Sequence, residues 1–423
     1  MMKKNLSFLI ALAVSLTVNT AVFADAANSA APSNTNVINT SSDTITLTLD
    51  DVINNLEKSN TELKLMNDKI NSLNKQFDID HNYAISINVD SNDPKVNRSN
   101  AYLLVKLAQD VRPLSDVQQI KDAKNAREER LNVIKFDLQR QYMNVLNSRD
   151  QIDNINKTLS NIDEKIAQLK EKIKVGQATS NELDALNVQK IQLETQKNDV
   201  QNGIDQSLLK IKQYLNIDLN KNINLVSLKK AFVAFDDKDI SNKITVAASK
   251  DYALSSLNGY IDLVKKQNDI YTKYAHNYFP DPSNPMQQMI RGLNYVTNET
   301  SSKSQLADLQ NKLISVNAGL PQALWGNYYA LKNKEAAVQT QMLTEKSAQD
   351  AYDKLKKNFE AGMIDKVTLD SAALELDKQK NLTERTVNEY MVAQDEFNYI
   401  LQGHASGYLN MSKQSMGTPG IGY

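Results

Sequence analysis

The chain contains no cysteine, which excludes a disulfide framework, thiol chemistry and a lipid anchor attached to cysteine. Glycine and proline are also scarce, at 12 and 8 of 423 residues, as is typical of proteins built from long helices. Neither sign of charge dominates, with 50 acidic and 49 basic side chains. The composition therefore does not indicate binding to nucleic acid or to anionic lipid.

Long hydrophobic runs are almost absent. The one prominent run, residues 6–18, follows two lysines and precedes the small residues Ala24 and Ala26. This pattern predicts a secretory signal peptide over residues 1–26. The following residues, 27–45, are rich in Asn, Ser, Thr and Ala and are predicted to form a flexible linker. No later segment approaches the ~18 consecutive apolar residues of a membrane-spanning helix, so we expect an exported chain without one.

The chain is rich in apolar residues at heptad spacing. One series steps by sevens from Val117 to Ile173, and a second runs from Ile120 to Leu169. This predicts one long, straight helix with a narrow apolar seam. Four polar side chains interrupt the seam, namely Lys124, Arg127, Gln141 and Ser148. They are compatible with lining a water-filled tunnel or with setting register and oligomeric state, and the sequence does not choose between these roles.

The long helix is predicted to end in a tight turn. Gly176 can adopt the left-handed conformation that closes a helix, and Thr179 and Glu182 have the spacing of a capping box that opens the next one. A second apolar seam follows over residues 183–215. The sequence therefore predicts a long helical hairpin whose tip is at residues 175–177.

The same hairpin occurs twice. A set of landmark residues recurs 186 positions later without a gap: Tyr142, Gly176, Leu183 and Leu215 correspond to Tyr328, Gly362, Leu369 and Leu401. Asp365 replaces Thr179 as the residue expected to cap the return helix. Repetition over this length indicates two copies of one structural unit. We expect repeats at 46–225 and 243–401, an inter-repeat linker at 226–242 and a disordered tail at 402–423.

Each repeat is predicted to begin with a shorter helix, over residues 49–77 and 243–279. In the first half, residues 83–89 and 101–107 alternate around a turn and predict a short β-hairpin. Ser115 and Gln118, at capping-box spacing, are expected to open the long helix.

The second half differs in its connection. Pro280, Pro282 and Pro285 argue against a strand there. Pro321 is expected to kink the second long helix, because proline removes a backbone hydrogen bond. The predicted fold class is therefore mainly α, a two-fold repeat of long antiparallel coiled-coil hairpins with at most one short β-hairpin.

No catalytic constellation is recognisable. His81, His276 and His404 are isolated in the sequence, without a carboxylate or second histidine at ligand spacing on a shared helix face. A phosphate-cradling glycine loop and a nucleophile elbow are also missing from the sequence. We therefore predict a protein that is not an enzyme and uses no metal or cofactor.

These features together resemble the TolC-like outer-membrane efflux channel family. The similarity spans residues 46–401 and includes Tyr142 and Tyr328 in the long helices and the tip sequences at 175–183 and 361–369. The opening Leu49-Asp50-Asp51 is also similar to the start of that family's first helix. The resemblance implies a homotrimer whose long helices close into an α-barrel tunnel, capped by a β-barrel in the outer membrane.

The resemblance also implies partners and sites. The helix tips would dock to a periplasmic adaptor (membrane fusion protein) joined to an inner-membrane pump. By position, the partner-binding tip residues are Val175, Gly176, Gln177, Ala361, Gly362 and Met363. Acidic side chains that narrow the tunnel entrance would be Glu182, Asp184 and Asp370, although Thr368 stands where the second repeat should carry an acid. The residues alone favour a helix cap for Glu182, because Thr179 is at capping-box spacing, and ordinary solvated side chains for Asp184 and Asp370.

Two functions remain open at this stage. One is a TolC-like duct of a tripartite efflux or type I secretion system, passively conducting exported substrates. The other is a barrel-less envelope protein or extracellular coiled-coil scaffold or docking protein, because the candidate strands are shorter than the ~9–11 residues of a membrane-crossing strand. Membrane association is left undecided between them. We expect localisation in the cell envelope, in the outer membrane if the cell has one, and otherwise at the cell surface or secreted.

Overall fold

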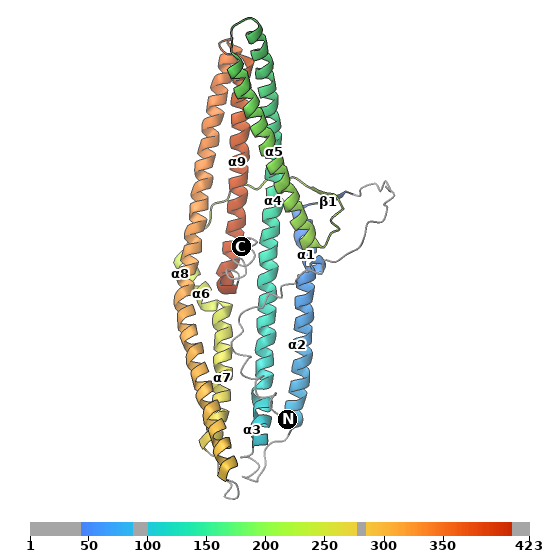
Figure 1. Cartoon of the computed structure of the whole chain (residues 1–423). Helices are drawn as coiled ribbons and strands as arrows, with labels where there is room; N and C mark the ends of the chain where they lie inside the picture. Colours follow the sequence, from blue (N-terminus) through green and yellow to red (C-terminus); the bar gives the residue numbers. More distant parts are fainter. Residues whose placement is uncertain (1–43, 88–99, 277–284, 408–423) are drawn as a thin grey trace, which may run out of the picture. The chain divides into compact units, whose positions relative to one another are not determined.

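The computed structural model describes residues 44–87, 100–276 and 285–407 (Figure 1). The predicted signal peptide and nearly all of the predicted linker at 27–45 lie outside these residues. The elements of the first half are β1 (Ile45–Leu47), α1 (Leu49–Ser59), α2 (Thr61–Ser86), α3 (Asn100–Asp110), α4 (Arg112–Lys174), α5 (Ser180–Leu215) and β2 (Ile223–Leu225). Those of the second half are α6 (Ile240–Lys250), α7 (Tyr252–His276), α8 (Pro285–Glu360), α9 (Lys366–Tyr399) and the π-helical turn η3 (Ile400–His404).

The predicted mainly helical fold with two long hairpins is confirmed. Helices α4 and α5 form the first hairpin and α8 and α9 the second. The two strands form one small parallel sheet in which Ile45 is aligned with Ile223 and Leu47 with Leu225. Within the described part of the chain, no helix is both long enough and apolar enough to cross a membrane.

The hairpin turns are built in the same way in both repeats. Gly176 and Gly362 have φ angles of 74° and 70°, in the left-handed region that a side chain disfavours. The next amide, of Gln177 or Met363, donates to the carbonyl five residues earlier, at 2.8 Å and 2.9 Å respectively. This is the Schellman helix ending predicted from the two glycines.

The start of the return helix differs between the repeats. Asp365 accepts a hydrogen bond from the backbone N–H of Thr368 at 2.8 Å, as predicted. Thr179 stands at the corresponding N-cap position of α5, but its side chain makes no capping hydrogen bond. The predicted Thr179–Glu182 capping box is therefore wrong. The extended backbone of Thr179 alone begins the helix, and Glu182 supplies an acidic charge in the first turn, where the helix dipole favours it.

The predicted β-hairpin is wrong. Residues 83–86 belong to α2, and residues 101–107 belong to α3; residues 88–99 lie outside the described part of the chain. The alternating residues of the second segment also include apolar side chains four positions apart. The helical conformation is stabilised by packing against α7. One cluster buries Leu103, Leu107 and Val111 together with Ile270 and Tyr271 of α7.

The first helix of each repeat is interrupted by a buried polar residue. Asn60 separates α1 from α2, accepts from the N–H of Leu63 at 3.0 Å and donates to the carbonyl of Tyr214 at 3.0 Å. Asp251 separates α6 from α7 in the same way and accepts from the N–H of Ala253 at 2.9 Å. The predicted single helix at 49–77 is thus two helices joined at Asn60.

The long helices also begin differently from the prediction. Helix α4 starts at Arg112, with Pro113 in its first turn, where the missing N–H costs no hydrogen bond. Ser115 and Gln118 are therefore already inside the helix and do not form the predicted capping box. Gln118 donates instead to Asp122 at 2.9 Å. Helix α8 continues through Pro321 without a break, and a kink there stays a prediction.

The apolar seam of α4 is largely as predicted. Its buried members include Ile134, Leu138, Val145, Ile155, Ile162 and Ile166. The exception is Val117, which is 50% exposed. At its level the buried positions are Asp116, Gln118 and Ile120, because polar contacts with α2 and α7 turn a different face of the helix inwards.

The four long helices form a layer in the order α5, α4, α9, α8. Helices α4 and α9 are antiparallel neighbours in the middle, joined by Lys157 and Asp377 at 2.7 Å and by Lys165 and Ser371 at 3.3 Å. Helices α5 and α8 pack on their outer sides. Beyond the layer, α2 packs against α4, and α7 packs against α8 and α4 (Figure 1).

Candidate docking site at the helix tips

Both hairpin tips lie at the same end of the molecule (Figure 1). The first tip connects α4 to α5 and the second connects α8 to α9. Because α4 and α9 run antiparallel, the end of α4 lies beside the start of α9, as the contact between Lys165 and Ser371 shows. The structure thus brings together two groups of residues that are far apart in the sequence.

All six predicted partner-binding residues are exposed. Val175 and Met363 are 68% and 71% exposed, among the most exposed large apolar side chains described. The other four, Gly176, Gln177, Ala361 and Gly362, are exposed as well. Each tip therefore presents one uncovered apolar side chain beside a rigid glycine turn, which is the kind of surface that a partner protein can cover.

The acidic side chains predicted to narrow the entrance differ in their exposure to solvent. Glu182 and Asp184 are exposed on α5, whereas Asp370 is half-buried on α9. The Asp370 carboxylate lies 3.9 Å from the ammonium group of Lys366, one turn earlier in its own helix. A surface pair of this kind contributes little to stability. Within one chain, Asp370 is thus partnered by a lysine.

Lysines of α4 also lower the pKa of an aspartate at the second tip. Hydrogen bonds from Thr368 hold the pKa of the Asp365 carboxyl below its usual range, and the charges of Lys172 and Lys165 lower that pKa further. The sequence shows Asp365 as a cap but not its basic neighbours, because they come from the other repeat. The two tips are therefore linked electrostatically as well as by packing.

The described residues include no group of three or more His, Cys, Asp or Glu side chains placed to hold a metal ion. His81 stacks on the ring of Phe77, with centroids 5.3 Å apart. His404 lies against Glu129, a partner that the sequence does not reveal because it is on a different element. The side chain of His276 lies outside the described residues.

A second set of contacts, present in both repeats, lies midway along the long helices α4 and α8, where each helix holds a connecting segment. In the first repeat, the Tyr142 hydroxyl donates to the carbonyl of Val226 at 2.6 Å and lies 3.2 Å from that of Leu47. It thereby fastens both strands to α4 at the end of the sheet where the two parallel strands finish.

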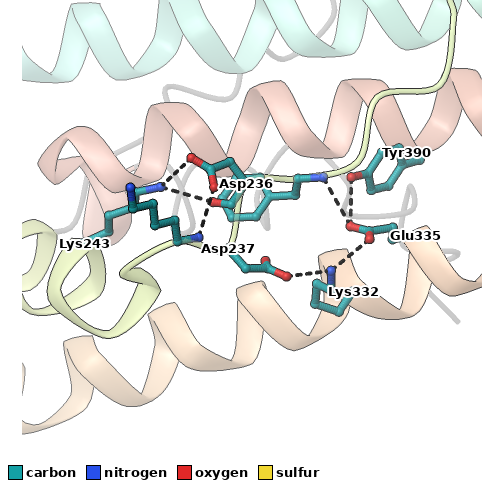
Figure 2. Close-up of polar contacts among 8 residues, drawn as sticks. Asp236, Asp237, Lys243, Lys332, Glu335 and Tyr390 are labelled. Carbon is teal, nitrogen blue, oxygen red and sulfur yellow. Dashed lines mark hydrogen bonds and ion pairs between the residues drawn. The ribbon is translucent and has the colours of Figure 1, made fainter.

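The second repeat holds the inter-repeat linker with a polar network (Figure 2). Glu335 of α8 accepts from the hydroxyl of Tyr390 at 3.0 Å and from the N–H of Phe235 at 3.4 Å. Lys332 bridges Glu335 at 2.8 Å and Asp237 at 2.9 Å. Burial, reinforced by Glu335, raises the pKa of Tyr390 to about 12, so its hydroxyl remains a donor at neutral pH.

Comparison with known proteins identifies the fold. No protein-family model and no curated protein sequence matches the chain, but solved structures do. The outer membrane protein VceC of Vibrio cholerae superposes with a TM-score of 0.56 at 7% identity, covering 85% of this chain and 97% of that one. The Campylobacter jejuni outer membrane channel CmeC gives a TM-score of 0.53 at 13% identity, covering 87% and 89%.

A third similar structure is the open state of the Neisseria gonorrhoeae MtrE outer membrane channel. Its TM-score is 0.54 at 10% identity, with 84% of this chain and 89% of that chain covered. The chain therefore has the fold of the TolC-like outer-membrane efflux channels, over nearly the whole length of the structures it matches. The predicted resemblance is confirmed at the level of the fold.

Proposed function

We propose that the chain is the channel component of a tripartite efflux or type I secretion system. Three copies form a tunnel that conducts exported substrates passively. The helix tips dock to a periplasmic adaptor, which is held by an inner-membrane pump. The protein works in the cell envelope, in the outer membrane of a cell that has one.

The observation that carries this proposal is the incomplete four-helix layer. Its two edge helices, α5 and α8, expose large apolar side chains to solvent: Val188, Ile191 and Leu209 on α5, and Ile314, Tyr329 and Leu343 on α8. Uncovered apolar side chains on both edges favour association with neighbours. Because the two edges differ, copies associate head to tail, and a head-to-tail contact that closes on itself gives a ring.

The tips support the docking part of the proposal. Val175 and Met363 are exposed at the same end of the layer, and in a trimer that end carries six tips around one axis. Glu182, Asp184 and Asp370 then occur three times each near the mouth of the tunnel. Repeated acidic side chains at a mouth attract cations and repel anions, which is the role proposed for them here.

Sedimentation of the mature chain, from Ala27 onwards, tests the proposal. We expect a trimer, and we expect it to need detergent if the duct is anchored in a membrane. A trimer that forms equally well without detergent favours the alternative, an envelope scaffold or docking protein. A well-folded helical monomer at micromolar concentration would rule out the tunnel.

A further inference from the structure

The end of the second repeat, beyond α9, packs against α6, α4 and the start of α7. After α9 the chain continues through η3 and another short helical stretch to Gly407. Gly403, Ala405 and Gly407 are buried. The predicted disordered tail at 402–423 is therefore wrong for residues 402–407, because they have a partner surface; residues 408–423 lie outside the described part of the chain.

This C-terminal segment, residues 400–407, fits closely against two other elements. A side chain at Gly407 would place its Cβ 2.5 Å from the ring of Tyr252 and 2.8 Å from the carboxyl carbon of Glu129. Such distances exclude any residue larger than glycine without movement of the neighbours. The segment is thus seated between α4, which carries Glu129, and the start of α7, which carries Tyr252.

The seat contains two fully buried acids. Glu129 is 0% exposed, and its Oε1 lies 2.8 Å from Nδ1 of His404. Its other oxygen, Oε2, has no hydrogen-bond partner among the described residues. Asp251 is likewise 0% exposed and accepts from the N–H of Ser406 at 3.1 Å and from the Ser406 hydroxyl. A buried carboxylate with an unsatisfied oxygen is costly unless a proton or cation compensates it.

Acidic groups surround His404 from several elements. Glu128 and Glu129 come from α4, Asp251 from the joint between α6 and α7, and the ring of Tyr399 stacks on the imidazole with centroids 4.5 Å apart. Tyr252 also faces this site, and burial together with Glu129 raises its pKa to about 12, so it is neutral. Lys250 of α6 approaches Gly403 of the segment through its backbone. The proton of the Glu129–His404 pair is thus held in a locally negative environment.

We propose that Glu129 and His404 form a proton-dependent latch, which fastens residues 400–407 onto α4 and the α6–α7 joint at neutral pH and below and releases them at alkaline pH. Glu129 belongs to the first repeat and His404 follows the second, so the latch joins the two repeats. It is a property of the single chain and does not depend on the proposed transport function.

The direction of the effect follows from both groups. The hydrogen bond with Glu129 raises the pKa of His404, and burial raises the pKa of Glu129. In each case the docked segment binds the proton more tightly than the released one. Docking is therefore complete below the ordinary pKa of histidine and weakens as the pH rises through the raised pKa of His404. Above it, Glu129 is a buried anion beside Asp251 with no compensating charge.

Amide hydrogen exchange of the full chain between about pH 6 and about pH 9 tests the latch. Protection factors of residues 399–407, corrected for the intrinsic exchange rate, should fall by up to about tenfold per pH unit between the ordinary pKa of histidine and the raised pKa of His404, and level off above it, as loss of one bound proton requires. Peptides from the middle of the α4–α9 contact serve as the internal reference and should keep constant protection.

Two variants and a control separate the latch from general pH effects. His404→Gln, at a partly exposed side chain, and Glu129→Gln should both give protection of residues 399–407 that is independent of pH. His81→Gln, which alters the histidine stacked on Phe77 of α2, should keep the pH dependence of the unmodified chain. Equal protection at both ends of the pH range in the unmodified chain, or an unchanged pH dependence in His404→Gln, would overturn the latch.

Discussion

Arg149 and Glu335 occupy the same position of the two repeats, yet they bind the chain through opposite chemistry. Arg149 of α4 donates from Nη1 to the carbonyl of Leu225 at 3.2 Å, whereas Glu335 of α8 accepts from the N–H of Phe235 at 3.4 Å. Both contacts hold a connecting segment against the middle of a long helix. The repeat therefore preserves the level at which the connection is fastened, although the side chain has changed from a donor to an acceptor.

The Glu335 network should matter for stability. Glu335→Ala removes the acceptor of the Tyr390 hydroxyl and of the Phe235 N–H and leaves Lys332 with Asp237 alone. Leaving buried donors unpaired should lower the free energy of unfolding by about 1–3 kcal/mol, measured by urea denaturation. Lys334→Ala, at an exposed neighbouring position, is the control and should have little effect. An unchanged unfolding midpoint for Glu335→Ala would show that the network contributes nothing.

Glycines of the tip and of a helix interior should respond in opposite directions. Gly362→Ala forces a side chain into the left-handed conformation and should destabilise the chain by about 1–2 kcal/mol. Gly203→Ala, inside α5 with open space around it, should instead stabilise the chain by roughly 0.5–1 kcal/mol, because alanine favours the helix. Thermal unfolding measures both changes. A Gly362→Ala variant as stable as the unmodified chain would contradict the left-handed turn at the tip, and a destabilised Gly203→Ala variant would contradict the open helical position of Gly203.

The edge of the helix layer should control assembly. Ile191 is 62% exposed on α5, so Ile191→Asp should leave the single chain folded while placing a charge in the contact between copies. We expect sedimentation to show dissociation of the trimer to monomers at micromolar concentration. Gln192→Asp adds the same charge at the adjacent exposed position and tests whether charge alone is responsible. A trimer that survives Ile191→Asp unchanged would place the contact elsewhere.

Features set by local chemistry were predictable from the sequence. Gly176 and Gly362 were recognisable because a left-handed turn requires glycine, and Asp365 because helix N-caps favour short polar side chains. The failures have a tertiary cause. Leu103 and Leu107 alternate as in a strand, but packing on α7 makes the segment helical.

Contacts between segments far apart in the sequence were beyond sequence analysis altogether. Glu129 and His404 are 275 residues apart, and neither stands out in its own helix. Tyr142 was recognised as a landmark of the repeat, but its two carbonyl partners come from the segments before α1 and after β2. Periodicity reports which face of a helix is buried and not which distant group meets it, so the latch and the mid-helix contacts required the structure.

A buried pair of carboxyl groups lies between α2 and α4. Asp80 and Asp116 are 4% and 8% exposed and share a hydrogen bond. Asp80 also lies 2.9 Å from Nε of Arg112 and accepts from Gln76 at 2.8 Å. Burial, followed by the hydrogen bond and the charge of Asp80, raises the pKa of Asp116 to about 6. The folded chain therefore holds this proton more tightly than the unfolded chain does.

The sign of the resulting pH dependence is fixed. Since the folded pKa of Asp116 is raised, its favourable contribution is complete below the unfolded pKa of 3.8 and is lost as the pH rises through about 6. Asp116→Asn keeps a hydrogen-bonding side chain without a charge, so its stability relative to the unmodified chain should increase between about pH 5 and about pH 7. Urea unfolding across this range measures the difference. Asp78→Asn, at an exposed position of α2, should track the unmodified chain, and a constant difference for Asp116→Asn would mean that Asp116 is already ionised at the lower pH.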